Sequence, residues 1–411
     1  MGELKVIVKE ILKDIGMRTI RLLLKIYFIF PIKKNRVIFE SYVGKQYSCN
    51  PKYISEALLD TEDNYDVIWA FENPDHYNDL KTQGIHVIRD RGPVFWYYRL
   101  TAKVSVTNVM WRNYTPIRKD QYEIQTWHGG GGGYKKTLAD DKEQEKKKVT
   151  LRRHLKNFER YSLVLTSSAT SLRTNARMAM QYKGVVLGGT PRNDMLLNHD
   201  RPKLSDKVRG YFEITGDTKI ALYAPTWRKG AVKEDFDIDY EAFKQALKKR
   251  FGGEWVVLRR MHWMAADFFK ETSDSYIKAE SYPDMQELLY AVDVLISDYS
   301  SSIWDYSFTG KPCFLLCFDL KKYREDRDFY NPITSWGFPL AQSNEELIQE
   351  INKFDEDDYL KKMEEQHTKN TSFEDGHASK NVCKIIKSMC YGDGRLPEGL
   401  PYKFYVEESQ K

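Results

Sequence analysis

Short apolar runs recur along this chain from residue 37 onward, and segments with helical spacing separate them. Runs rich in β-branched and aliphatic residues predict buried strands, and many of these runs end in Gly, Ser, Thr or Asp. Strand–helix alternation predicts parallel sheets with helices on both faces. The predicted strands are Val37–Glu40, Asp66–Phe71, His86–Arg89, Val104–Asn108, Glu123–Trp127, Leu163–Thr166, Val185–Leu187, Ile220–Tyr223, Trp255–Leu258, Val292–Ser297 and Cys313–Cys317. Predicted helices include Pro51–Leu59 and Tyr240–Phe251.

The number of predicted strands exceeds one sheet, and 411 residues exceed one ordinary core. We therefore expect an α/β fold with two Rossmann-like domains that face a cleft, where the carboxyl ends of the strands meet ligands. The segment from Asn198 to Asp217 is the weakest join between them. The predicted units are a helical segment at 1–35, a first domain at 36–200, a second domain at 201–390 and a tail at 391–411.

The N-terminal segment is basic, because residues 1–36 hold nine Lys or Arg against three acids. The apolar residues with helical spacing are Leu4, Val8, Ile11, Leu12 and Ile15. The next apolar run, Leu22–Phe30, contains Lys25 and is too short to span a bilayer, and no cleavage site follows it. We expect an amphipathic helix that lies in an anionic membrane surface. The alternative is a helix packed on the body of the protein.

Composition excludes several classes of function. The net charge of +5 over 411 residues gives no reason to expect nucleic acid as a partner. The five cysteines include no CxxC pair, so we expect no disulfide framework and a reducing compartment. Cys313 and Cys317 flank an apolar run and are interpreted as buried thiols. Since we see neither an Asp-rich pair nor a His/Cys cluster, we expect no obligatory metal and no cofactor.

One predicted strand delivers a histidine, His128, to a run of five glycines. Glycines permit close backbone approach and leave amide groups for an anion. The spacing is not that of a P-loop, because Tyr134 stands where the second Gly belongs. A histidine at a strand end is well placed for acid–base catalysis. The alternative is a flexible loop with a core histidine at its root. The residues assigned to an acceptor or phosphate loop are Gly129, Gly130, Lys135 and Lys136.

Other strand ends carry cations and hydroxyl groups suited to a phosphate. Arg192 follows a Gly-Gly-Thr-Pro turn, Thr226 follows the strand that ends at Tyr223, and Arg260 precedes His262. Purely structural turns are the alternative at each place.

A buried strand also runs into a serine cluster at 300–302, where a helix N-terminus can bind an anion. One turn later, Asp305 can accept ribose hydroxyls. The alternative is that the serines only cap the helix. The predicted donor-binding residues are Asp298, Ser300, Ser301, Asp305, Thr226, Arg192 and Arg260.

Taken together, these motifs resemble the CDP-glycerol glycerophosphotransferase family of teichoic-acid and capsule polymerases and primases, from about Phe39 to Ile386. The matching strings are Gly44-Lys45-Gln46-Tyr47-Ser48 with Asn50-Pro51-Lys52, Thr126-Trp127-His128-Gly129, Thr190-Pro191-Arg192-Asn193-Asp194, Tyr223-Ala224-Pro225-Thr226-Trp227, Arg260-Met261-His262, Ser297-Asp298-Tyr299-Ser300-Ser301 and Asp375-Gly376-His377-Ala378-Ser379. Family members often read Trp-His-Gly-Thr-Pro-Leu-Lys, whereas this chain has Gly130 and Gly131 at Thr-Pro. This departure leaves the acceptor open.

The resemblance implies a GT-B-like fold, in which the second domain holds the nucleotide and the first receives the acceptor. It makes His128 the catalytic base and His262 the second essential histidine, and it places the acid at Asp305 on the ribose.

The implied reaction moves glycerol phosphate from CDP-glycerol, or ribitol phosphate from CDP-ribitol, to a hydroxyl of a lipid-linked or polymeric glycan, and releases CMP. We expect a peripheral protein at the cytoplasmic face of the cell membrane. The alternatives are a GT-B transferase that uses a UDP- or GDP-sugar, and a non-catalytic membrane adaptor. A homo-oligomer is left open.

Overall fold

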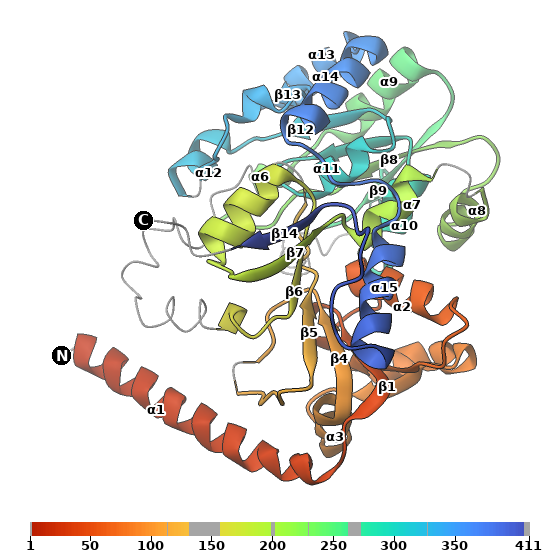
Figure 1. The fold of residues 1–411 in the computed structure, drawn as a ribbon. Coiled ribbons are helices and arrows are strands. Elements are labelled where there is room, and N and C mark those ends of the chain that lie inside the picture. Colours follow the sequence, from red (N-terminus) through yellow and green to blue (C-terminus); the bar gives the residue numbers. More distant parts are fainter. Residues whose placement is uncertain are drawn as a thin grey trace.

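The computed structural model describes residues 2–112, 114–130, 157–198, 202–228, 230–261, 273–326 and 328–406. These residues form two sheets, each with helices against it (Figure 1). The strands are β1 Lys33–Glu40, β2 Asp66–Phe71, β3 His86–Arg89, β4 Ala102–Thr107, β5 Tyr122–Gln125, β6 Leu163–Thr166, β7 Gly184–Gly188, β8 Lys219–Tyr223, β9 Trp255–Arg259, β10 Ile277–Lys278, β11 Val294–Ser297, β12 Cys313–Leu316, β13 Leu340–Ala341 and β14 Lys403–Val406.

The described chain also contains α-helices, labelled α, and other helical segments, labelled η. They are α1 Gly2–Leu24, η1 Lys25–Ile29, η2 Tyr42–Gly44, α2 Cys49–Leu59, η3 Pro74–Gln83, α3 Pro93–Thr101, α6 Ala169–Ser171, η5 Leu172–Ala179, η6 Pro191–Asn193, α7 Asp194–Leu197, α8 Pro202–Tyr211, η7 Lys233–Phe236, α9 Tyr240–Phe251, α10 Met285–Ala291, α11 Ser302–Ser307, α12 Leu320–Asp326, η9 Ile333–Ser335, α13 Asn344–Asn352, α14 Glu356–Lys369 and α15 Ala378–Tyr391.

The first sheet has the order β14-β7-β6-β5-β4-β1-β2-β3, and strands β1 to β7 pair in parallel. Alternate residues of a strand point to opposite faces. In β1, Val37 and Phe39 therefore enter the core beneath α2 and α15, while Ile38 enters the core that contains Phe95 of α3. A sheet covered on both faces explains why its strands are continuous apolar runs.

The second sheet has the order β10-β9-β8-β11-β12-β13 and is parallel throughout. Its core extends along the sequence from Met195 to Met363. Cys313 and Cys317 are buried, as predicted. The structure confirms the predicted α/β class with two Rossmann-like domains, and a strand forms at each predicted place. Sequence reasoning missed β10, β13 and β14, of which the first two have only two residues each.

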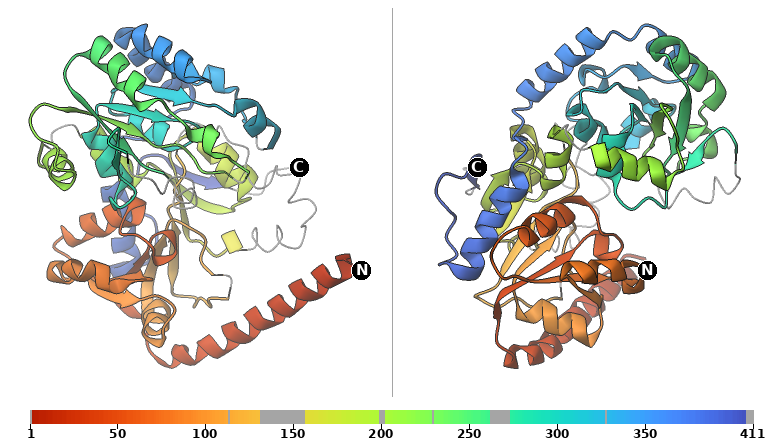
Figure 2. Two further views of the ribbon diagram at one scale, coloured as in Figure 1. Left: turned by 180° about the vertical axis from the view of Figure 1, so that it is seen from behind. Right: turned by 90° about the vertical axis from the view of Figure 1, so that its right-hand side faces the viewer.

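The C-terminal part of the described chain returns to the first domain, which differs from the predicted domain limits. Ile386 of α15 lies in the core under the first sheet, and β14 pairs antiparallel with β7. Residues 378–391 were expected in the second domain or at the start of a tail, but their apolar face matches the first sheet. Figure 2 shows α15 beside the first domain, below α14. Conversely, Met195 and Leu196 of α7 pack in the second core, although they precede the predicted boundary.

Helix α1 extends away from the two domains, as Figures 1 and 2 show. The turn that follows it is attached to the body, because Arg118 donates hydrogen bonds to the carbonyl oxygens of Phe30 at 2.8 Å and Tyr27 at 3.0 Å. Phe30 also packs edge-on against Tyr97 of α3. None of the helices in the described ranges combines the length and the apolar character that crossing a bilayer requires.

We expect Ile386→Ala to destabilise the first domain by about 2–5 kcal/mol, because it leaves a cavity in a fully buried place. Hydrogen exchange should then accelerate in β1 and β4 and not in β8 or β11. The matched control is Ile351→Ala, which removes the same group from the second core and should have the opposite pattern. Faster exchange in β8 after Ile386→Ala would contradict the assignment of α15 to the first domain.

Candidate functional site

A tight turn follows β5 and presents His128. Trp127 has a φ of +55°, which is strained for a residue with a side chain. Several hydrogen bonds hold this conformation. The Gln125 side chain accepts from the Trp127 amide at 2.9 Å, and the Thr126 amide donates to the Thr107 carbonyl at 2.8 Å. Asn50 donates to the carbonyl oxygens of both Thr126 and Trp127 at 3.1 Å. We call residues 126–128 the histidine turn.

The ring of His128 is held in a defined orientation. Its Nδ1 lies 2.8 Å from the carbonyl oxygen of Asn108, its ring stacks on Trp127, and the Tyr42 ring lies 5.6 Å away. A carbonyl oxygen only accepts, so Nδ1 carries the proton and the lone pair of the neutral ring is on Nε2. Asn108 is itself fixed by the Tyr42 amide and the Ser41 hydroxyl. This arrangement suits a general base.

The second glycine after this turn, Gly130, lies against the other domain. A Cβ atom on Gly130 would lie 2.9 Å from Nη2 of Arg192 and 2.9 Å from Oδ1 of Asp305, which is too close for any real side chain. Arg192 belongs to the first domain and Asp305 to α11 of the second. The structure therefore brings the start of the glycine run directly against the segment predicted to hold the donor.

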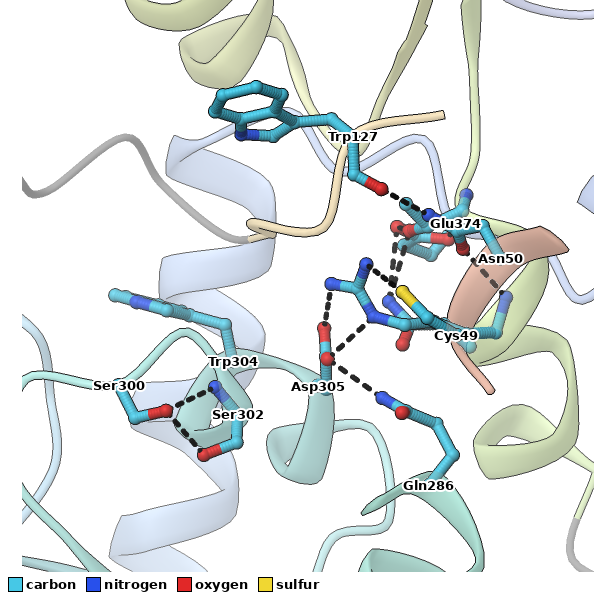
Figure 3. Close-up of polar contacts among 12 residues, drawn as sticks. Cys49, Asn50, Trp127, Gln286, Ser300, Ser302, Trp304, Asp305 and Glu374 are labelled. Atoms are coloured by element: carbon cyan, nitrogen blue, oxygen red, sulfur yellow. Dashed lines mark hydrogen bonds and ion pairs between the residues drawn. The ribbon is translucent and has the colours of Figure 1, made fainter. Parts of the chain in front are cut away.

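Arg192 and Asp305 contact each other. Both are buried, and they pair through two hydrogen bonds, from Arg192 Nε at 2.9 Å and Nη2 at 3.0 Å (Figure 3). Gln286 donates a third bond to the same carboxylate at 2.9 Å. Burial alone would lower the pKa of Arg192, but Asp305 raises it well above its ordinary value. In this structure the two residues form an ion pair that joins the domains, and their phosphate and ribose contacts stay predictions.

The serine cluster is arranged as a helix start. Ser300 is half-buried, and its hydroxyl oxygen accepts from the Ser302 amide at 3.2 Å and from the Ser302 hydroxyl at 2.8 Å (Figure 3). Ser301 is the N-cap residue of α11, but its side chain makes no capping bond. Ser300 therefore performs the structural role that was the alternative interpretation, while Ser301 remains half-buried beside it.

Asp298 lies between the end of β11 and the serine cluster. Its carboxylate has several partners within the protein. It accepts from the Thr226 amide at 2.8 Å and pairs with Arg228 at 2.9 Å. Burial raises the pKa of Asp298 above its ordinary value, although Arg228 and the amides act against that rise. Asp298 thus fixes the end of β8 against the end of β11, and its predicted contact with the donor stays a prediction.

Arg260, the other predicted donor cation, forms no ion pair among the residues that the structure describes. One of its Nη atoms donates to the carbonyl oxygens of Ala279 at 2.7 Å and Tyr282 at 2.6 Å. Burial lowers its pKa. Thr226 is half-buried at the end of β8. The predicted residues His262, Lys135 and Lys136 lie outside the described residues.

Sequence reasoning missed the role of α2 in this site. Lys52 crosses to the second domain, where its Nζ lies 2.6 Å from both Asp284 and Glu287. Burial by itself would raise the pKa of Glu287, but Lys52 and Lys207 lower it to about 2. The string Asn50-Pro51-Lys52 was the available signal, yet a string cannot say that Asn50 faces the histidine turn while Lys52 faces α10.

No cluster of three His, Cys, Asp or Glu suited to a metal ion occurs within the described part of the chain. The prediction that no metal is obligatory stays a prediction.

Two Rossmann-like domains, with a fixed histidine at the edge where they meet, define a protein of the GT-B-like fold class. Comparison with known families is more specific: a model described as CDP-Glycerol:Poly(glycerophosphate) glycerophosphotransferase matches residues 22–388. The chain belongs to this family, which is the one that its motifs resemble. It is therefore a transferase of the CDP-glycerol glycerophosphotransferase kind.

Individual relatives agree with the family. The teichoic acid poly(glycerol phosphate) polymerase of Bacillus spizizenii is 29% identical over 96% of this chain and 97% of that protein. The polymerase of the same name from Bacillus subtilis is 29% identical over 87% of this chain, which spans about half (50%) of that relative. A poly(ribitol-phosphate) polymerase of Bacillus spizizenii is 26% identical over 80% of this chain and 52% of that protein.

A solved structure has the same fold. A variant of the wall teichoic acid polymerase TagF, soaked with CDPG, superposes with a TM-score of 0.75 at 26% identity and covers 92% of this chain and 96% of that one.

Proposed function

We propose that this chain transfers glycerol phosphate from CDP-glycerol to a hydroxyl group of a lipid-linked or polymeric acceptor in teichoic acid synthesis, and releases CMP. The observation that carries the proposal is the orientation of His128. Its Nδ1–H donates a hydrogen bond to the Asn108 carbonyl oxygen, and its turn lies against the donor domain through Gly130. A base at this place can act on a hydroxyl that approaches a phosphate bound at the ends of β8, β9 and β11.

In the proposed reaction, the acceptor oxygen forms a bond to the phosphorus that carries the glycerol. The bond from that phosphorus to the oxygen of CMP breaks, and Nε2 of His128 takes the hydroxyl proton. Phosphoryl transfer depends mainly on positioning and on electrostatic stabilisation. Arg260 is the described cation that we assign to the diphosphate, in place of Arg192. The role of His262 as a second essential histidine stays a prediction.

Glycerol phosphate is favoured over ribitol phosphate because the poly(glycerol phosphate) polymerases are 29–30% identical to this chain, whereas the ribitol-phosphate enzymes are 26–27% identical. A capsule polymer is the alternative product.

We also propose that the protein works at an anionic membrane surface, on its cytoplasmic face. Supporting this, the end of α1 and the turn η1 leave a row of large apolar side chains in solvent. The most exposed are Leu22, Leu23, Ile26 and Ile29, at 67%, 67%, 68% and 75%. A continuous apolar patch of this kind is typical of a membrane or protein contact.

A recess of about 540 Å³ adjoins this apolar row. Phe28 and Ile32 line one part of it, and three cations from separate segments line the rest, with one acid. The cations are Lys34, Lys103 and Arg118, and the acid is Asp120. Apolar groups beside excess positive charge match the glycerol backbone and phosphate of an anionic phospholipid. The recess is at the amino ends of β1, β4 and β5, so it is separate from His128.

Replacement of His128 by alanine should lower turnover by roughly 10²–10⁴-fold, because a general base contributes about that much. Binding of CDP-glycerol, measured by calorimetry, should persist. His86→Ala, at an exposed histidine on β3, is the control and should keep normal turnover. Normal turnover by the His128 variant would refute its role as base.

The donor is tested by thermal unfolding with CDP-glycerol, CDP-ribitol, UDP-glucose and UDP-N-acetylglucosamine. A ligand at 100 times its Kd stabilises a protein by roughly 2.7 kcal/mol, which raises the melting temperature measurably. We expect the largest rise with CDP-glycerol. A rise with a UDP-sugar alone would contradict the proposed reaction but not the fold.

The double variant Lys34→Gln/Lys103→Gln should weaken binding to phosphatidylglycerol vesicles by about tenfold or more, since each cation near an anionic surface contributes roughly 1 kcal/mol. Co-sedimentation measures this. The control is Lys361→Gln/Lys384→Gln on α14 and α15, which removes the same charge from exposed places. Equal weakening by the two variants would show that binding depends on overall charge and not on the recess. Equal binding of the parent protein to phosphatidylcholine and phosphatidylglycerol vesicles would contradict the preference for an anionic membrane.

A further inference from the structure

A continuous series of polar contacts runs from the donor domain to the histidine turn. Asp305 on α11 accepts from the side chain of Arg192, and the Arg192 amide donates to Oδ1 of Asn50 at 3.0 Å. Asn50 in turn donates to Trp127, the residue before His128, at 3.1 Å (Figure 3). Asp305, Arg192 and Asn50 therefore connect the donor domain to the histidine turn through direct hydrogen bonds.

Asn50 uses its whole side chain in this series. It is fully buried, its Nδ2 group donates to two carbonyl oxygens, and its Oδ1 accepts one amide. Few other side chains can do this, since aspartate has no donor and glutamine is longer by one methylene group. Both carbonyl oxygens belong to the histidine turn, so Asn50 binds that turn at two consecutive residues.

The surrounding backbone shows why such a support matters. Trp127, Cys49 and Tyr42 all have positive φ values, of 55°, 60° and 47°. Each such conformation costs roughly 1–3 kcal/mol, and it persists only where neighbouring contacts determine it. Cys49 directly precedes Asn50, and Tyr42 packs beside His128. The strained residues thus gather around the residue that we assign as base.

The other end of the series is fixed by the second domain. Asp305 also accepts from Gln286 of α10, and α10 is held to α2 through Lys52. Asn50 and Lys52 lie on the same helix, α2, so one helix contacts both the histidine turn and the donor domain. The orientation of the turn consequently depends on the two domains being together.

We propose that Asn50 is a positioning residue for the transfer reaction: with Arg192 and Asp305, it sets the place of His128 relative to the donor phosphate. The proposal rests on the function proposed above for His128. Asn50 touches neither substrate; it acts through the carbonyl oxygens of residues 126 and 127. A displacement of about 1 Å in a reacting group costs around 10²-fold in rate.

The test is Asn50→Asp, which keeps the size and the acceptor of the side chain and removes its two donor hydrogens. We expect kcat to fall by about 100-fold, while the KM for CDP-glycerol stays within about threefold. The matched control is Asn157→Asp, another buried amide of the first domain, which donates to the carbonyl of Trp111 at 3.0 Å. Its kcat should stay within about twofold of the parent value.

A double-mutant cycle separates positioning from stability. In the His128→Ala background, Asn50→Asp should have no further effect on kcat, because there is no base left to position. An equal fall in both backgrounds, or an unchanged kcat in the Asn50 variant, would overturn the proposal while leaving the role of His128 intact. Normal turnover by His128→Ala alone would instead overturn the proposed function.

If Asn50→Asp does not fold, Arg192→Lys tests the same series of contacts. Lysine keeps the charge and loses the two parallel bonds to Asp305, so kcat should again fall with little change in KM. A normal kcat in a folded Arg192→Lys protein would overturn the link between the domains.

Discussion

The buried ion pair between Arg192 and Asp305 is the interaction on which the arrangement of this site depends. Moving two charges out of water is costly, and the cost is repaid only when the geometry is good and other hydrogen bonds complete the pair. Both conditions are met here by the two parallel bonds and by Gln286. Removing one partner of such a pair typically costs about 3–5 kcal/mol. Gly130 lies directly against this pair, which leaves no space for a side chain at that position.

The fold was predictable because the pattern of apolar residues in each strand indicates which of its faces are buried. Val37, Ile38 and Phe39 are all apolar, which indicates a strand covered on both faces, and the structure places them in two cores. The strand ends were predictable for the same reason: His128 follows β5 of the first sheet, and Ser300 follows β11 of the second. The partner of α15 was not predictable in this way, because the apolar face of a helix does not say which sheet it covers.

The assignments at the site were harder, because they depend on pairs far apart in the sequence. An aspartate one turn into a helix has the same local pattern whether it meets a ribose or an arginine 113 residues away. Asp298 is a similar case, since Arg228 and the Thr226 amide occupy it. Asn50 could not have been singled out, because nothing local shows that its amide reaches two carbonyl oxygens of another loop.

The return of α15 and β14 also has a consequence for synthesis on the ribosome. The core of the second domain is complete once Met363 has emerged, whereas the core of the first still lacks Val382 to Cys390. Domains generally fold as units while the chain is being made. The domain that comes later in the sequence can therefore acquire its core first, and α2, which carries Asn50, is covered by α15 only after almost the whole described chain has been translated.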